Sequence, residues 1–211
     1  MPKKRKILVL VNPFSGRRLA AANWEIARPI LEKAHVDMTV IMTERAGHAY
    51  DIVNKELKQG DYDGIVTVSG DGLIHEVVNG LYRRNDCLQL MSSMTIGFIP
   101  GGSANGLVKA VLHRSGEEYS VESAAFVVGK GRQIKMDLTE IDAEYQREKI
   151  YSFLCVFWGI LADCDINSEV IRCVGPARFT LWGIYRVMCM KRYAGSVYYT
   201  GTRIGSKQDA A

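Results

Sequence analysis

Two patterns of hydrophobic residues alternate along the first part of the chain. Short apolar runs are typical of buried strands, and longer segments with apolar residues at helical spacing are typical of amphipathic helices. The predicted strands are residues 7–11, 38–42, 64–68 and 95–99, and the predicted helices are 19–34 and 47–59, with further helices starting near 73 and 103. Because strands and helices alternate, we expect an α/β fold with a parallel sheet and helices on both faces.

The pattern changes after residue 130, where shorter apolar segments are separated by charged residues. The predicted elements of this part are strands at 134–141, 149–157 and 196–200 and a helix at 179–190. Consecutive strands joined by short turns favour antiparallel pairing. We therefore expect a parallel-sheet lobe at 1–130, followed by a partial antiparallel β-sandwich at 131–211, which has too few strands to close within this chain.

Composition narrows the class of protein. The 211 residues are 47% hydrophobic, which is enough for a substantial core, and the five cysteines form no C-x-x-C pair. We expect reduced, structural cysteines, with neither a disulfide scaffold nor a zinc site. No apolar run reaches the ~18 residues of a membrane span, so we expect an intracellular, cytoplasmic protein. A net charge of +4 with 23 acidic residues does not call for a nucleic-acid partner.

One dense basic run, Lys3-Lys4-Arg5-Lys6, precedes the first predicted strand. Such a run is compatible with nuclear import or with contact to an anionic membrane surface. A simpler interpretation is that solvated charges guard the start of a very apolar strand.

Three of the predicted strands end in loops that carry glycine. These loops are residues 12–16, 69–72 and 100–105. The carboxyl ends of parallel strands meet at one edge of a sheet, and open α/β sheets bind ligands there. Asp71 lies between two glycines in the second loop, so its carboxylate is expected at that edge. The third loop precedes a helix, whose first amides suit phosphate oxygens, although glycines in such loops can serve only to turn the chain.

These parts suit phosphoryl transfer from a nucleotide, which mainly requires positioning and charge neutralisation. Neither the P-loop lysine motif nor the protein-kinase His-Arg-Asp motif occurs in the sequence. Those two classes of kinase are therefore disfavoured.

Residues 68–81, VSGDGLIHEVVNGL, resemble the core of the diacylglycerol-kinase-type lipid kinases in their sphingosine kinase form. Further similarity lies in LVNP at 10–13, TER at 43–45, PGGSAN at 100–105 and GILADCD at 159–165. The resemblance covers nearly all of residues 5–200. It implies a nucleotide-binding α/β lobe, a β-sandwich that accepts the lipid, and ATP with Mg²⁺ in the cleft between them.

The resemblance also implies roles for individual residues, with Asp71 activating the primary hydroxyl of sphingosine. The positions that match the nucleotide site are Asn12, Pro13, Phe14, Thr43, Glu44, Arg45, Gly70, Gly72, Glu76, Gly102, Ser103, Ala104, Arg172 and Arg178. The positions that match the lipid site are Ser69, Gly70, Asp71, Gly72 and Asp165. A carboxylate such as Asp165 complements the ammonium group of a sphingoid base. No metal ligand is assigned.

We therefore expect an ATP-dependent kinase that converts sphingosine, or a related sphingoid base, to sphingosine 1-phosphate at a peripheral membrane surface. Two features depart from the pattern: the loop 14–18 is less rich in glycine and lysine, and Ala104 stands where glycine is usual. Family members also continue well beyond 211 residues. The alternatives are a kinase for ceramide or diacylglycerol, or a truncated, catalytically weak protein that binds lipid or a partner.

Overall fold

The computed structural model describes residues 4–144, 148–175 and 177–194, with the side chains of Arg17 and Arg172 outside the described part. The chain divides into two compact units, Met1–Val156 and Phe157–Ala211.

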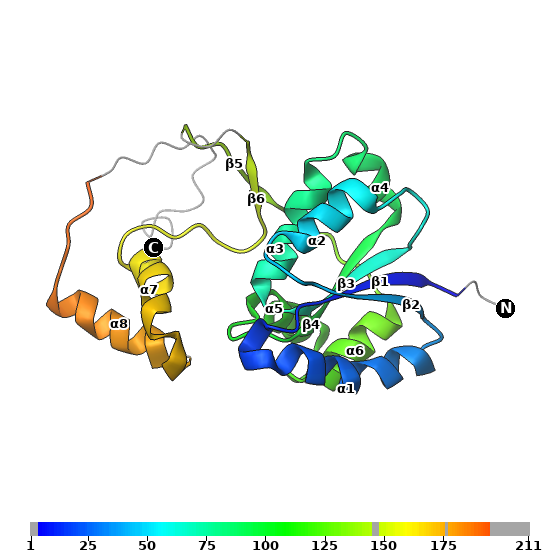
Figure 1. The fold of residues 1–211 in the computed structure, drawn as a ribbon, viewed down its shortest axis with the longest axis horizontal. Coiled ribbons are helices and arrows are strands. Elements are labelled where there is room, and N and C mark those ends of the chain that lie inside the picture. Colours follow the sequence, from blue (N-terminus) through cyan, green and yellow to red (C-terminus); the bar gives the residue numbers. More distant parts are fainter. Residues whose placement is uncertain (1–3, 145–147, 176, 195–211) are drawn as a thin grey trace, which may run out of the picture. The chain divides into compact units, whose positions relative to one another are not determined.

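The first unit is built on a parallel sheet of four strands (Figure 1). The strands are β1 (Lys6–Val11), β2 (Asp37–Met42), β3 (Gly64–Ser69) and β4 (Thr95–Pro100), in the order β2-β1-β3-β4. All four coincide with predicted strands, and the α/β fold class is confirmed. The two central strands are almost entirely buried, which explains their continuous apolar sequences.

The strand order reverses between β1 and β3, because β2 lies on the outer side of β1. Val11 is level with Met42 on one side and with Val68 on the other, and Val68 is level with Ile99. The four carboxyl ends therefore finish at nearly the same height, so the loops that follow them share one edge. A reversal of this kind is the usual ligand-binding position of an open α/β sheet.

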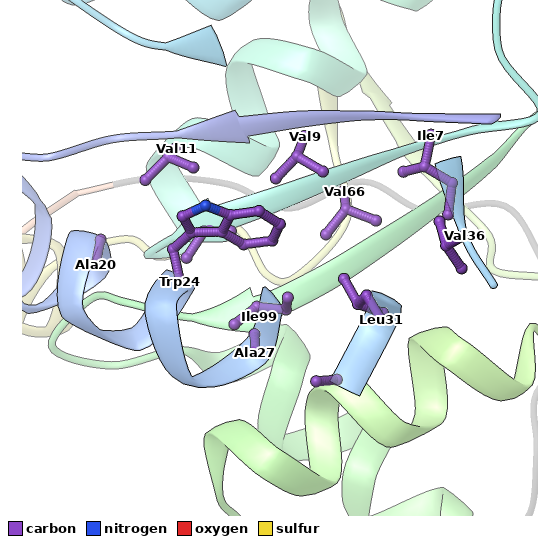
Figure 2. Packing of buried hydrophobic residues seen from close by; sticks show 12 residues of the cluster. Ile7, Val9, Val11, Ala20, Trp24, Ala27, Leu31, Val36, Val66 and Ile99 are labelled. Carbon is purple, nitrogen blue, oxygen red and sulfur yellow. The ribbon is translucent and has the colours of Figure 1, made fainter. Parts of the chain in front are cut away.

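One face of the sheet is covered by α1 (Leu19–Lys33) and α6 (Val121–Lys130) (Figure 1). Figure 2 shows Trp24 and Leu31 of α1 against the valines and isoleucines of the strands. Pro29 lies inside α1, and the helix continues through it to Lys33. The apolar positions at helical spacing thus form the core stripe that the sequence predicts.

The other face carries α2 (His48–Asp51), η2 (Ile52–Glu56), α3 (Asp71–Tyr82) and α4 (Cys87–Ser93). The predicted helix at 47–59 is thus a short α-helix followed by a π-helical turn, and α4 is a helix that the sequence pattern did not predict. After β4, α5 (Gly106–Ser115) packs Leu107 against Ile74 and Val78 of α3. A single 3₁₀ turn, η1 (Ser15–Arg18), precedes α1.

A small antiparallel sheet of β5 (Thr139–Ile141) and β6 (Ile150–Ser152) also belongs to the first unit. It occupies the two segments predicted as strands, with shorter extents. Asn79 of α3 substitutes for a neighbouring strand, because its Nδ2 donates to the Tyr151 carbonyl and its Oδ1 accepts from the Tyr151 N–H, both at 2.9 Å. These bonds attach the hairpin to the sheet-bearing unit, and the first compact unit accordingly extends to Val156. A domain boundary near residue 130 stays a prediction.

The second unit contains α7 (Ile160–Asn167), η3 (Ser168–Val174) and α8 (Ala177–Met188) within the described residues. The predicted helix at 179–190 corresponds to α8, and the predicted strand at 196–200 lies outside the described residues. Arg186 joins the two helices by pairing with Asp163 at 2.8 Å and by donating to the Tyr193 hydroxyl at 2.8 Å. Across the described part of the chain, no helix combines the length and apolarity that a membrane crossing requires.

Gly80 is expected to be required for the close approach of α3 to α2. A methyl group at this position would lie 2.9 Å from the Tyr50 carbonyl oxygen and would overlap the Val53 side chain. We expect Gly80→Ala to lower the free energy of unfolding by about 1–3 kcal/mol, measured by urea denaturation. Gly72→Ala is the matched control on the same helix, since no atom lies within 4 Å of its added methyl. Equal unfolding midpoints for the two variants would contradict this account of the packing.

Candidate active site

The loops after β1, β3 and β4 meet backbone to backbone at the carboxyl edge of the sheet. Gly16 adopts a left-handed conformation with φ of 55°, and a methyl on it would overlap the Gly101 carbonyl. A methyl on Gly70 would lie 3.1 Å from the Gly102 Cα. Glycine is therefore needed in these loops, because their backbones touch at the positions that a Cβ atom would occupy.

Hydrogen bonds connect the same loops. The Gly70 N–H donates to Ser15 Oγ at 3.0 Å, and the Gly101 N–H donates to the Ser69 carbonyl at 2.9 Å. Ser69 is buried, and its hydroxyl donates to the Gly70 carbonyl at 2.8 Å. Asn12 closes its own turn, because its Oδ1 accepts from the Phe14 N–H at 3.0 Å. The predicted residues of these loops are thus brought together.

Asp71 is the first residue of α3, and its carboxylate also meets the start of α5. One oxygen accepts from the Gly106 N–H at 2.8 Å, and the other accepts from the Leu107 N–H at 3.2 Å. The carboxylate thus lies at the N-termini of two helices, where the helix dipoles favour a negative charge. Backbone groups hold the position and orientation of this half-buried side chain.

Two amides of the loop after β4 have no hydrogen-bond acceptor among the described residues. Ser103 and Ala104 are exposed, and their N–H groups donate to no described residue. The Gly102 N–H is instead occupied by Asn105 Oδ1 at 2.8 Å. Of the three residues predicted to contact the nucleotide here, Ser103 and Ala104 are therefore the ones with amides available for phosphate oxygens.

The residues after β2 form a second group at the same edge. Thr43 is buried and donates its N–H to the Val11 carbonyl at 2.8 Å. Arg45 pairs with Asp51 at 2.5 Å, and hydrogen bonds from Lys55 and Arg45 lower the pKa of Asp51 to about 2. The exposed Arg45 therefore already has an anionic partner within the protein.

Two further predicted residues connect to the start of α2. Glu44 donates its N–H to His48 Nδ1 at 3.1 Å, and Glu76 of α3 accepts from the Ala49 N–H at 3.2 Å. Through Glu76, the helix that begins at Asp71 is joined to the group after β2. Pro13 is half-buried, whereas the neighbouring Phe14 exposes 62% of its surface.

The remaining predicted residues belong to the second unit. Asp165 is exposed on α7, and its carboxylate has no partner among the described side chains. Arg178 pairs with Glu169, and its guanidinium lies 4.4 Å from the centre of the Phe179 ring. The side chain of Arg172 is outside the described part. A common site for these residues and Asp71 stays a prediction.

Comparison with known proteins shows the family of the chain. Residues 6–141 match the family model of the diacylglycerol kinase catalytic domain. The chain belongs to that family. The match begins at β1 and ends at β5, so it includes each loop described above except those of the second unit.

The relatives of this diacylglycerol kinase family member include sphingosine kinases. The chain is 37% identical over 198 residues to sphingosine kinase 1 of Arabidopsis thaliana, covering 93% of this chain and 40% of the relative. It is 36% identical over 208 residues to human sphingosine kinase 2, covering 94% and 31%. The chain therefore spans less than half the length of these two relatives.

A solved structure supports the fold. The crystal structure of a diacylglycerol kinase from Bacillus anthracis matches with a TM-score of 0.52 and 26% identity, over 65% of this chain and 44% of the other. The α/β architecture and the family assignment from sequence are thus both confirmed.

Sequence reasoning did not select Ser15, Asn79 or Asn105, although each fixes part of this region. Ser15 joins the first loop to Gly70, Asn79 holds β6, and Asn105 closes the loop after β4. A signal was present for Asn105, because it immediately precedes a helical pattern and Asn is favoured at such junctions. Nothing in the sequence indicates which atoms Ser15 and Asn79 bind.

Asp71 is expected to stabilise the fold as well as to carry chemistry. Asp71→Ala leaves the Gly106 and Leu107 amides without their acceptor, so we expect a loss of about 1–2 kcal/mol in unfolding free energy. Asp71→Asn keeps one acceptor oxygen and should lose less. Urea denaturation of both variants tests this order. An alanine variant as stable as the wild type would show that these two bonds contribute nothing to stability.

Proposed function

We propose that this chain carries the catalytic part of an ATP-dependent lipid kinase that phosphorylates the primary hydroxyl of a sphingoid base such as sphingosine. The observation that carries the proposal is the Asp71 carboxylate, oriented by two amides of α5 next to a loop in which two amides have no acceptor among the described residues. The sphingosine kinases among the relatives support the choice of lipid.

The nucleotide phosphates would contact the loop after β4. Amides at a helix N-terminus bind phosphate oxygens directly, and the helix dipole favours their charge. Asn12, Gly70 and Gly72 would line the same edge, together with Thr43, Glu44, Arg45 and Glu76 from the neighbouring loop. Arg172 and Arg178 would supply positive charge from the second unit, where Arg178 would exchange Glu169 for a phosphate.

In the proposed reaction the primary hydroxyl oxygen of the lipid attacks the γ-phosphorus of ATP. A bond forms between that oxygen and phosphorus, the bond between phosphorus and the β,γ-bridging oxygen breaks, and ADP leaves. Asp71 accepts the hydroxyl proton as general base. Because its two oxygens are held by backbone amides, the carboxylate needs no reorientation when the lipid arrives.

Magnesium would enter with the nucleotide. Among the residues that the structure describes, no three His, Cys, Asp or Glu side chains gather into a metal-binding group. Mg²⁺ is commonly held by substrate phosphates and one or two carboxylates, so the nucleotide itself would supply much of its coordination. When bound, the ion neutralises charge on the phosphate oxygens.

Asp165 would select the lipid by pairing with its ammonium group. Its exposed carboxylate on α7 pairs with none of the side chains that the structure describes, whereas Asp163 is already paired with Arg186. An uncharged acceptor such as diacylglycerol or ceramide offers Asp165 no charge to neutralise. Contact with a peripheral membrane surface would deliver such a lipid.

A second candidate is a catalytically weak protein that binds lipid or a partner. Exposed apolar side chains favour it, among them Leu181, Ile184 and Val187 of α8. The direct test of the leading proposal is to incubate the 211-residue chain with sphingosine and labelled Mg-ATP. Lipid phosphate supports the kinase, whereas a folded chain that binds lipid vesicles and transfers none favours the second candidate.

Asp71→Asn is expected to lower transfer to sphingosine by at least about 100-fold, because the general base is lost. ATP affinity should stay within about threefold of the wild type, since no nucleotide contact is assigned to the Asp71 side chain. Steady-state turnover and ATP titration measure the two effects. Turnover at the wild-type rate would contradict the assignment of Asp71 as general base.

Asp165→Asn is expected to raise the KM for sphingosine about tenfold or more, because an amide does not neutralise an ammonium group. The KM for ATP should not change. The control acceptor is an N-acylated sphingoid base, whose use should be equally poor with both proteins. The assigned role fails if ATP affinity falls while the KM for sphingosine is unaltered.

A further inference from the structure

Asn105 occupies an unusual position between the loop after β4 and the helix α5. Only 4% of its surface is exposed, and its backbone is left-handed with φ of 51°. Non-glycine residues adopt this conformation at a cost, and surrounding contacts must hold them there. Asparagine tolerates it better than most residues, and its side chain also carries both a donor and an acceptor.

Both ends of the Asn105 amide bind the loop that precedes it. Oδ1 accepts from the Gly102 N–H at 2.8 Å, and Nδ2 donates to the Gly102 carbonyl at 2.8 Å. Nδ2 also donates to the Tyr119 hydroxyl at 2.8 Å, which links the loop to the segment before α6. One side chain thus satisfies both backbone groups of Gly102 and fixes the course of the two residues in between.

This closure determines which amides the loop offers to a ligand. The Gly102 N–H is used internally, while the N–H groups of the exposed residues Ser103 and Ala104 have no acceptor among the described residues. Without the side chain of Asn105, no side-chain hydrogen bond to Gly102 would hold residues 102–105 in this conformation. Glycine-rich segments lose the most conformational entropy when they are ordered.

The backbone of Asn105 also bears on Asp71. The left-handed turn at this residue begins α5, and the next two amides, of Gly106 and Leu107, hold the Asp71 carboxylate. Asn105 therefore joins the loop with free amides to the helix start that orients the proposed base.

We propose that Asn105 is a positioning residue: its side chain preorganises the amides of Ser103 and Ala104 for the phosphate oxygens of a nucleotide, and its backbone turn presents α5 to Asp71. The inference rests on the proposed function for the identity of the ligand. It separates two roles, because the side chain serves nucleotide binding and the left-handed backbone serves Asp71.

Asn105→Gly tests this separation, because glycine keeps the left-handed backbone without strain and removes only the side chain. Two hydrogen bonds to Gly102 are lost, so we expect the Kd for ATP, measured by titration of the 211-residue chain, to rise about tenfold. The KM for ATP should rise in parallel, while the KM for sphingosine stays unchanged and kcat falls less than threefold. Asn105→Asp should bind ATP no better than Asn105→Gly does, because a carboxylate oxygen then faces the Gly102 carbonyl oxygen.

Two control variants distinguish positioning from general stability. Tyr119→Phe removes only the third bond of the Asn105 amide, and its Kd for ATP should change less than threefold. Asn54→Ala removes a comparable half-buried amide, which donates to the Gly80 carbonyl at 3.0 Å at the other end of α3. It should lower the unfolding midpoint without changing the Kd for ATP. Asn105→Gly with an ATP affinity within twofold of the wild type would overturn the inference.

The outcome for the wild type keeps this proposal distinct from the proposed function. A wild-type chain that binds ATP but phosphorylates no sphingosine contradicts the kinase proposal, and the ATP titrations alone then decide the role of Asn105. A wild-type chain that binds no ATP overturns both proposals.

Discussion

The contact of glycine backbones at the carboxyl edge of the sheet is the constraint on which the rest of the site depends. Gly16 touches Gly101 and Gly70 touches Gly102, at separations that leave no room for a Cβ. Because the loops touch in this way, residues from three strand ends come within hydrogen-bonding distance of one another. The register of the parallel sheet brings the strand ends level with one another. The glycines then allow the loops that follow the strands to come into contact.

The electrostatics of the site come chiefly from backbone groups. Asp71 is held by the amides of Gly106 and Leu107 at the start of α5, and the loop that precedes this helix contains two further amides with no acceptor among the described residues. Arg45 and Arg178, in contrast, are paired with Asp51 and Glu169. Amides fixed in a fold need no reorganisation when a charge develops, whereas a paired arginine must first leave its partner. The amides are therefore the part of the site that is ready for an anion.

The helix that begins at Asp71 connects several parts of the first unit. Glu76 binds the start of α2, Gly80 lies against Tyr50, and Asn79 holds the backbone of Tyr151 in β6. Two of these contacts join α3 to α2 and the third joins it to β6, so the antiparallel hairpin is attached to the sheet-bearing unit. The second unit is held together differently, by Asp163, Arg186 and Tyr193 between its two helices.

Much of this protein could be predicted from its sequence. The apolar runs predicted all four strands of the parallel sheet, because strands buried on both faces leave a strong local pattern. The loop with Asp71 was identified for the same reason, since glycine and a carboxylate follow directly on such a strand. The motif around Asp71 also predicted the family correctly. Weaker patterns were less informative: α4, α6 and α7 were not predicted, and the strands of the hairpin proved shorter than expected.

What only the tertiary structure decided is which atoms meet across long separations in sequence. Gly16 and Gly101, Ser15 and Gly70, and Asp71 and Gly106 are brought together by the order of the strands, and no local pattern encodes these pairings. The structure also showed that the Gly102 amide is occupied and that, within the described part of the chain, the Ser103 and Ala104 amides have no acceptor. Sequence determined the strands of the parallel sheet and the family, because both follow from residue type and spacing. Which backbone groups find a hydrogen-bond partner depends on packing, which is a property of the whole fold.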